Sequence, residues 1–274
     1  FKDLTGDDQA YCRELRKRNR DERKNPTLPL LKVALPADLA AAIAALTPDQ
    51  RLRAAQIPVV SLFKGQVKNL GSGKYEWSYD FSRPDHGADW RSDTPSVWGI
   101  GSGQLIRNKG EGRPFWFRGK LRGEFSVAWK ALVKEGSRCN LVVCYGEGTN
   151  ALQVASGLGL DANVWCGIGR YATNATLEAL AVAGGSLSAK QSSLNFLCWQ
   201  IGDLLKLQMR QLRQELVPAR TEARTVRPDA VVIGFDSDEA TQFEMDDVRI
   251  TGVLDADWIK NEQLRVVAQQ PLGK

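Results

Sequence analysis

The sequence contains a single histidine, His86, among its 274 residues. One histidine excludes a metal site built from several imidazoles, and a serine–histidine–aspartate mechanism would have to use His86. No Gly-x-Ser-x-Gly segment is present to supply the nucleophilic serine of a hydrolase elbow. Because His86 stands in the polar segment Ser82–Gly87, we predict a solvated side chain in a turn rather than a catalytic base.

Cysteines are few and odd in number, and no Cys-x-x-Cys pair occurs. Cys139 and Cys144 are five residues apart, so on one strand they would point to opposite faces and could not bridge. The pattern favours reduced, structural thiols and a cytoplasmic location, whereas a signal peptide preceding Phe1 would mean export. We predict no metal and no cofactor.

No apolar run approaches the roughly 20 residues that a membrane-spanning helix needs. The net charge is +5, from 37 basic and 32 acidic residues. The segment from Arg13 to Lys24 has seven basic and three acidic residues, so 7 − 3 = 4 of these five charges lie there. We predict that this arm binds a protein partner through Arg13, Arg16, Lys17, Arg18, Arg20, Arg23 and Lys24. Nucleic acid or anionic lipid is the alternative, since basic side chains also bind phosphates.

Residues 1–58 read as a basic helical extension, residues 59–257 as a sandwich domain and residues 258–274 as a tail. A helix over Asp7–Arg23 would be polar nearly all round, so it needs a partner surface. The alanine-rich run Leu39–Leu46, followed by Thr47-Pro48-Asp49 as a stop and a new start, predicts a helical hairpin that ends before Pro58. Such a hairpin is too small to fold alone and is expected to dock on the domain after it.

From Ser61 onward, glycine becomes frequent and apolar residues alternate between turn signals, which is typical of β-strands. Many short strands without intervening helices favour an antiparallel β-sandwich or barrel. The segment Leu204–Arg213 contains good helix formers and is also compatible with a helix, but the turn Ile201-Gly202-Asp203 before it favours a hairpin strand. We predict strands at Gly65–Leu70, Glu76–Phe81, Trp98–Gly101, Gln104–Arg107, Phe115–Phe117, Gly123–Leu132, Cys139–Tyr145, Ala151–Ser156, Trp165–Arg170, Thr176–Ala183, Leu194–Gln200, Leu204–Arg210, Ala230–Asp236 and Thr241–Thr251.

Five short segments, in this order, carry a resemblance to a known superfamily. They are Tyr79-Asp80-Phe81 with Asp89-Trp90, then Trp98–Leu105, Arg122–Val127, Ile233–Phe235 and Phe243–Ile250. In order and spacing the chain resembles the concanavalin A-like (laminin G-like) jelly-roll superfamily, nearest the bacterial sandwich domains of the 3-keto-disaccharide hydrolase type. The resemblance implies a mainly β jelly-roll sandwich. It does not specify a function, because this fold carries lectins, glycosidases and adhesion modules alike.

Paired carboxylates would be needed for glycoside hydrolysis. Laminarinase-type sandwich enzymes carry an E-x-D-x-x-E strand, and Glu244 and Asp246 begin that pattern here. Arg249 occupies the position of the third acid, so the strand does not supply an acid–base pair. We expect Glu244 and Asp246 on the solvated face, with Phe243, Met245, Val248 and Ile250 in the core.

Tryptophan is abundant, with eight residues. Aromatic faces stack on sugar rings, whereas tryptophans at alternating strand positions, such as Trp129 and Trp199, fill the core. We predict that Trp90 and Trp116, which lie near loops and basic residues, are the exposed ones and bind a ligand.

Because the sequence offers no recognisable set of catalytic residues, we interpret the chain as a non-catalytic interaction or scaffolding protein, a subunit of a larger assembly. The alternatives are a carbohydrate-binding module or a 3-keto-disaccharide hydrolase-like enzyme, whose activity would be glycoside hydrolase-like. Nucleic-acid binding through the basic arm is a further alternative, and it would make affinity fall steeply with salt.

Overall fold

The computed structural model describes residues 37–111, 114–135, 138–145, 152–160, 164–171, 177–184, 193–211, 219–225, 229–237 and 239–269. The α-helices are α2 (Ala37–Ala44), α3 (Pro48–Ala55) and α4 (Ala256–Ala268), and the short 3-10 helices are η1 (Val59–Leu62), η2 (Pro84–Asp89) and η3 (Pro95–Val97). The strands are β1 (Gln66–Gly71), β2 (Lys74–Tyr79), β3 (Trp90–Arg91), β4 (Trp98–Gly101), β5 (Gln104–Arg107), β6 (Phe115–Phe117), β7 (Leu121–Glu135), β8 (Arg138–Tyr145), β9 (Leu152–Leu160), β10 (Val164–Tyr171), β11 (Leu177–Gly184), β12 (Ser193–Ile201), β13 (Leu204–Gln211), β14 (Ala219–Arg224), β15 (Val231–Asp236) and β16 (Gln242–Leu254).

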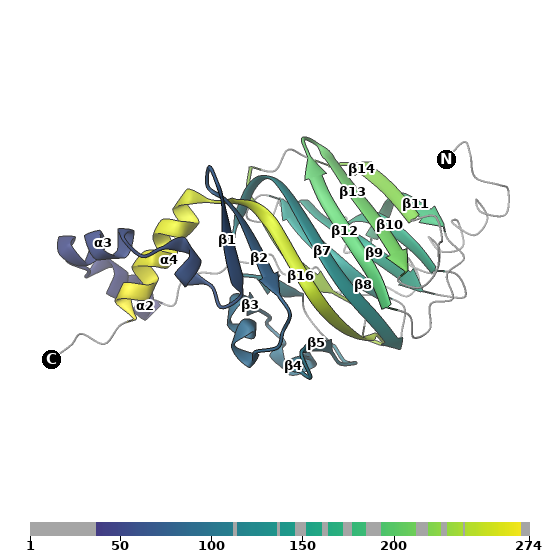
Figure 1. Ribbon diagram of the computed structural model, residues 1–274, viewed down its shortest axis with the longest axis horizontal. Coiled ribbons are helices and arrows are strands. Elements are labelled where there is room, and N and C mark those ends of the chain that lie inside the picture. The colour runs from purple at the N-terminus through teal and green to yellow at the C-terminus, as the bar shows by residue number, and fades with distance from the viewer. Residues whose placement is uncertain are drawn as a thin grey trace.

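Antiparallel pairing arranges these strands in two layers. The first sheet has the order β1-β2-β16-β7-β12-β13-β14, and the second has the order β3-β6-β15-β8-β9-β10-β11. The two join into one curled sheet where Val231 of β15 pairs with Leu121 of β7. The predicted mainly β antiparallel sandwich is thus confirmed, and Figure 1 shows the helices gathered at one end of it.

Every second side chain of the strands points into the space between the two sheets. Along β7 the side chains of Val127, Trp129 and Ala131 are buried, while those between them are partly exposed. The ring of Trp129 stacks on Phe196 of β12 at 4.8 Å and meets Phe235 of the second sheet edge-on at 5.7 Å. These contacts join the two layers through a common aromatic core.

In strand β16 the residues that point into the core change from odd-numbered to even-numbered positions at Asp247. Phe243 and Met245 are buried before Asp247, and Val248 and Ile250 are buried after it. Asp247 has a φ of 51°, and the register with β7 shifts between Asp246 and Arg249, which defines a β-bulge. The predicted core residues of this strand are all buried because the extra residue restores the apolar face.

The hairpin predictions hold, and two strands were missed, the two-residue β3 and β14. Ser102 and Gly103 have φ values of 54° and 73° in the turn between β4 and β5, the left-handed conformation that two-residue hairpins need. Leu204–Gln211 is a strand paired with β12, not a helix. Strand β14 lies in the next, charged stretch of the chain, where the alternation of apolar residues is too weak to have signalled it.

The segment assigned as a tail, 258–274, is helical as far as Ala268 in α4. Asp255 caps this helix by accepting a hydrogen bond from the Trp258 backbone N–H at 2.8 Å. The predicted hairpin of α2 and α3 docks on α4 through a cluster of Leu46, Ala54 and Leu264. In the described part of the chain no helix is long and apolar enough to cross a membrane, and the predicted helix Asp7–Arg23 lies outside that part.

A buried carboxylate, Asp89, ties the helical end to the sandwich. Its Oδ2 accepts hydrogen bonds from the backbone N–H groups of Lys64 and Gly65 at 2.6 and 2.9 Å and from the Tyr79 hydroxyl at 3.0 Å. Its Oδ1 lies 3.7 Å from the Arg118 guanidinium, which in turn pairs with Glu262 of α4 at 2.6 Å. Burial raises the pKa of Asp89, and these hydrogen bonds and Arg118 oppose that rise.

Replacing Asp89 with alanine is expected to lower the free energy of unfolding by about 3–5 kcal/mol, because the substitution leaves Arg118 buried beside unpaired backbone donors. Urea denaturation of the wild type and the variant measures the difference. Asp85→Ala is the matched control, since Asp85 is exposed and its ion pair is with Arg83, an exposed residue just before η2. Equal destabilisation by both substitutions would contradict the assigned role of Asp89.

Three cysteines of the described residues, Cys139, Cys144 and Cys198, are free thiols and buried. As predicted, Cys139 and Cys144 face opposite sides of β8, since Cys139 belongs to the central core and Cys144 to a cluster with Val142 and Trp116. Burial raises the pKa of Cys139 to about 12 and that of Cys144 to about 11.

These thiols are therefore expected to resist modification in the native protein at neutral pH, because the thiolate is the reactive form. Labelling with a disulfide reagent followed by peptide mass spectrometry measures each site separately. All three should react fully in denaturant. Rapid native labelling of Cys139 would contradict its placement in the core.

Candidate functional site

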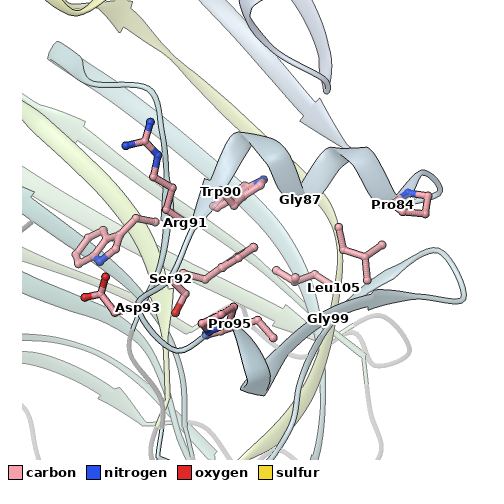
Figure 2. Close-up of a pocket in the computed structure, with 13 residues that line it drawn as sticks. Pro84, Gly87, Trp90, Arg91, Ser92, Asp93, Pro95, Gly99 and Leu105 are labelled. Atoms are coloured by element: carbon pink, nitrogen blue, oxygen red, sulfur yellow. The ribbon is translucent and has the colours of Figure 1, made fainter. Parts of the chain in front are cut away.

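A cleft of about 750 Å³ opens where η2, η3 and strands β3 to β6 meet. Its size is that of a small-molecule site. Figure 2 shows it extending from Pro84 at one end, past Gly87, Leu105 and Gly99, to Ser92 and Asp93 at the other. The side chains that line it are mainly aromatic and aliphatic; they belong to Pro84, Trp90, Arg91, Ser92, Asp93, Pro95, Trp98, Ile100, Leu105, Phe115 and Trp116, together with the backbone of Gly87 and Gly99.

A stack of three rings forms the floor. Phe115 lies between Trp90 and Trp98, with ring centroids 5.5 and 5.1 Å away and ring planes within 16° of parallel. Trp90 also contacts Phe235 at 5.6 Å, so the floor is continuous with the aromatic core. All three stacked residues are less than 10% exposed. The three rings therefore form one closely packed apolar surface along the cleft.

Trp116 points to the opposite side of β6 from Phe115 and Phe117. It packs with Val142 and Cys144 on the outer face of the second sheet. A Cβ built on Gly234 would come within 2.7 Å of the Trp116 ring, so the indole lies directly on the backbone of β15. Trp116 can therefore lie beside the cleft because Gly234 has no side chain.

The rim carries the polar groups. Ser92 accepts a hydrogen bond from the Thr94 backbone N–H at 3.2 Å, which fixes the loop that presents Asp93. Asp93 is exposed, and it is the only acid among the described residues that line the cleft. In Figure 2 the guanidinium of Arg91 extends away from Asp93 and Pro95. The rim therefore offers one carboxylate at its Asp93 end.

His86 does not match its prediction. The side chain is 4% exposed rather than solvated, and it packs edge-on against Tyr79 at 5.8 Å between ring centroids. Its Nδ1 lies 3.6 Å from Asp80 Oδ1. Long-range packing of η2 on β2 buries the residue, which the polar composition of its own segment could not reveal. His86 thus supports the wall of the cleft formed by η2.

The two predicted ligand residues, Trp90 and Trp116, line the same cleft, but both are buried, at 4% and 6% exposure, not exposed as predicted. Trp129 fills the core as predicted. Trp199 does not: it stands between the buried residues Cys198 and Gln200 and therefore points out of the first sheet, half-buried. The basic arm from Arg13 to Lys24 lies outside the described residues.

Sequence reasoning missed Trp98 and Asp93 as parts of the site. Trp98 occupies the first position of a strand and reads as a core residue, and Asp93 stands in a short polar loop without any motif. The signal for both is spatial, because residues 91–98 and strand β6 come together to line one cleft only in the folded chain.

The acids considered for hydrolysis lie elsewhere. Glu244 is on the outer side of β16, as predicted, and pairs with Lys134 of β7. Asp246 lies two residues further, with its pKa raised by burial and by the neighbouring carboxylates of Asp247 and Asp80. Neither residue lines the cleft. Across the described residues no cluster of three or more potential metal ligands occurs.

No protein-family model matches the chain, and no curated protein matches it. Solved structures do. The xylan beta-1,4-xylosidase of Bacillus halodurans is 13% identical with a TM-score of 0.50, covering 71% of this chain and 41% of its own. A mutant of the GH43 protein BlXynB of Bacillus licheniformis is 13% identical with a TM-score of 0.49, over 64% of this chain and 39% of its own. Lectin I-B4 of Griffonia simplicifolia is 9% identical with a TM-score of 0.48, over 64% and 98%.

The chain therefore spans about two fifths of the length of these two bacterial proteins, and its likeness to them concerns the fold. Strand order, antiparallel pairing and the similarity to the xylosidase agree with the fold that the resemblance in the sequence implied. This chain has an antiparallel jelly-roll sandwich fold.

Proposed function

We propose that this protein binds carbohydrate without cleaving it, and that the cleft holds one neutral sugar unit. The observation that carries the proposal is the combination of a rigid aromatic floor with a polar rim. The C–H faces of a sugar ring pack on apolar surface formed by Trp90, Trp98 and Phe115, while its hydroxyls need acceptors at the edge. Asp93 supplies such an acceptor.

The single carboxylate favours binding over hydrolysis. Both retaining and inverting glycosidases use two carboxyl groups across the scissile bond. Among the described lining residues Asp93 has no second acid facing it. The xylosidase that shares the fold acts on xylan, as its name states, which supports xylo-oligosaccharides as the first probes.

The interpretation as an interaction or scaffolding subunit stays a hypothesis. It depends on the basic arm, Arg13 to Lys24, which lies outside the described residues, and the same holds for nucleic-acid binding through that arm. The cleft gives the carbohydrate alternative a defined site.

Filling the cleft is expected to abolish binding. Ile100 lines the cleft and is partly exposed, so Ile100→Trp places a larger ring in it. Ile106→Trp is the matched control and should bind as the wild type does. Ile106 is also partly exposed, but it pairs with Gly99 on the opposite face of the same hairpin and does not line the cleft. Calorimetric titration with xylo-, cello- and manno-oligosaccharides gives the affinities, and tryptophan fluorescence of the wild type reports occupancy because three indoles line the site. Full binding by Ile100→Trp, or no binding of any glycan by the wild type, would overturn the proposal.

Removing the rim acceptor tests the polar half of the site. Asp93→Ala is expected to weaken binding by about tenfold or more, since a hydrogen bond to a charged group contributes about 1.5–3 kcal/mol. Asp85→Ala removes an exposed acid that does not line the cleft and should leave the affinity unchanged. Product analysis of the same mixtures should find the oligosaccharides intact, and their cleavage would show catalysis instead.

A further inference from the structure

Arg91 is the one basic side chain among the described residues that line the cleft. In β3 it is directly opposite Trp116 of β6, so both side chains leave this pair of strands on the same face. Trp90, the residue before it, belongs to the aromatic floor and points to the other face. Arg91 is also exposed. The cleft therefore has an accessible guanidinium on its Trp116 side, apart from the rings of the floor.

The charged groups around Arg91 come from the end of β6 and from α4. Arg118 directly follows β6, two residues after Trp116, and Glu262 and Arg265 lie one turn apart on α4. Partial burial of its head group lowers the pKa of Arg91, Glu262 opposes this change, and the positive charges of Arg118 and Arg265 add to it. Arg91 is thus near two other guanidiniums and a single carboxylate.

That carboxylate is already engaged by the other two arginines. Oε1 of Glu262 accepts a hydrogen bond from Arg118 Nη2 at 2.6 Å and another from Arg265 Nε. Arg118 also faces Asp89. Within the described residues the guanidinium of Arg91 forms no hydrogen bond and no ion pair. Of the three arginines that surround Glu262, the one that lines the cleft has no acid of its own.

A carboxylate on a ligand fits this position. A guanidinium stays protonated at physiological pH and can bind a carboxylate through two parallel N–H···O bonds. Because Arg118 and Arg265 repel Arg91, a negative charge bound there lowers the electrostatic energy of all three cations. One carboxylate matches the one arginine that has no partner.

The rest of the rim disfavours a polyanion. Asp93 is exposed at one end of the cleft, and in Figure 2 the guanidinium of Arg91 extends away from it. A chain of phosphates along the cleft would meet the Asp93 carboxylate as well as Arg91, and like charges repel. Sugar hydroxyls can instead donate hydrogen bonds to Asp93. The two rim charges therefore favour a saccharide with one acidic group over a nucleic acid.

We propose that the ligand is an acidic saccharide, in which a neutral unit packs on the floor of the cleft and a neighbouring uronic acid pairs its carboxylate with Arg91. This inference rests on the proposed carbohydrate site and specifies the class of its ligand. Arg91 and Asp93 then fix the direction of the saccharide, because the carboxylate goes to the first and hydroxyls go to the second.

Two matched ligands test the proposal. One is a xylo-oligosaccharide with a single glucuronic acid side group, and the other is its methyl ester, which keeps the shape and loses the charge. In calorimetric titration the wild type is expected to bind the free acid about tenfold more tightly, because a charge-assisted pair replaces a neutral contact. Added salt should reduce this preference, since it screens exposed charges.

Arg91→Gln should bind the acid and the ester with equal affinity. Arg249→Gln is the matched control and should keep the preference, because Arg249 is an exposed arginine of β16 that does not line the cleft. Equal affinities for the two ligands in the wild type, or a preference that survives Arg91→Gln, would refute the acidic ligand and leave the carbohydrate site standing. Failure of the wild type to bind either ligand or any neutral glycan would refute the site and this inference together.

Discussion

The arrangement of the candidate site depends on one buried carboxylate. Asp89 fixes the chain at Lys64 and Gly65, holds Tyr79 and faces Arg118, and the Arg118 backbone N–H donates to the Asp89 carbonyl at 2.9 Å. Trp90 follows Asp89 directly, and Phe115 to Phe117 precede Arg118. The two short strands that supply the aromatic floor are thus held at their ends by the same pair. Charged groups in such a place need every partner they have, because water cannot replace a lost one.

Gly65 shows how closely this region is packed. A Cβ at that position would come within 2.3 Å of the Tyr79 ring, so only glycine allows the backbone N–H to reach Asp89. Phe63, two residues earlier, stacks on Phe117 at 5.6 Å and on Trp258 of α4 at 5.5 Å. The helical end is therefore joined to the sandwich by ring contacts as well as by Arg118 and Glu262.

Most of the fold was predictable from local alternation, and most of the site was not. The strands from Glu76–Phe81 to Thr241–Thr251 follow the period of two that a half-buried sheet imposes. That rule also explains the error at Trp199. The residue was predicted in the core because of its type, although it alternates with the inward-pointing Phe196 and Cys198 and so points outward. The helix that begins after Asp255 was not predicted, although Asp255 is a suitable N-cap residue. The reason is that no glycine or proline lies between this helix and the last strand. Trp90 and Trp116 line one cleft, and their burial arises from strands far away in sequence.

The floor of the cleft and the core of the sandwich share their rings. Trp90 contacts Phe235, which meets Trp129, so a change of floor residue disturbs packing between the sheets. The rim has no such connection, since Asp93 is exposed and Gly99 borders open space. Variation among related chains would then concentrate at the exposed positions of residues 91–96, where ligand preference can drift while thermal stability is conserved.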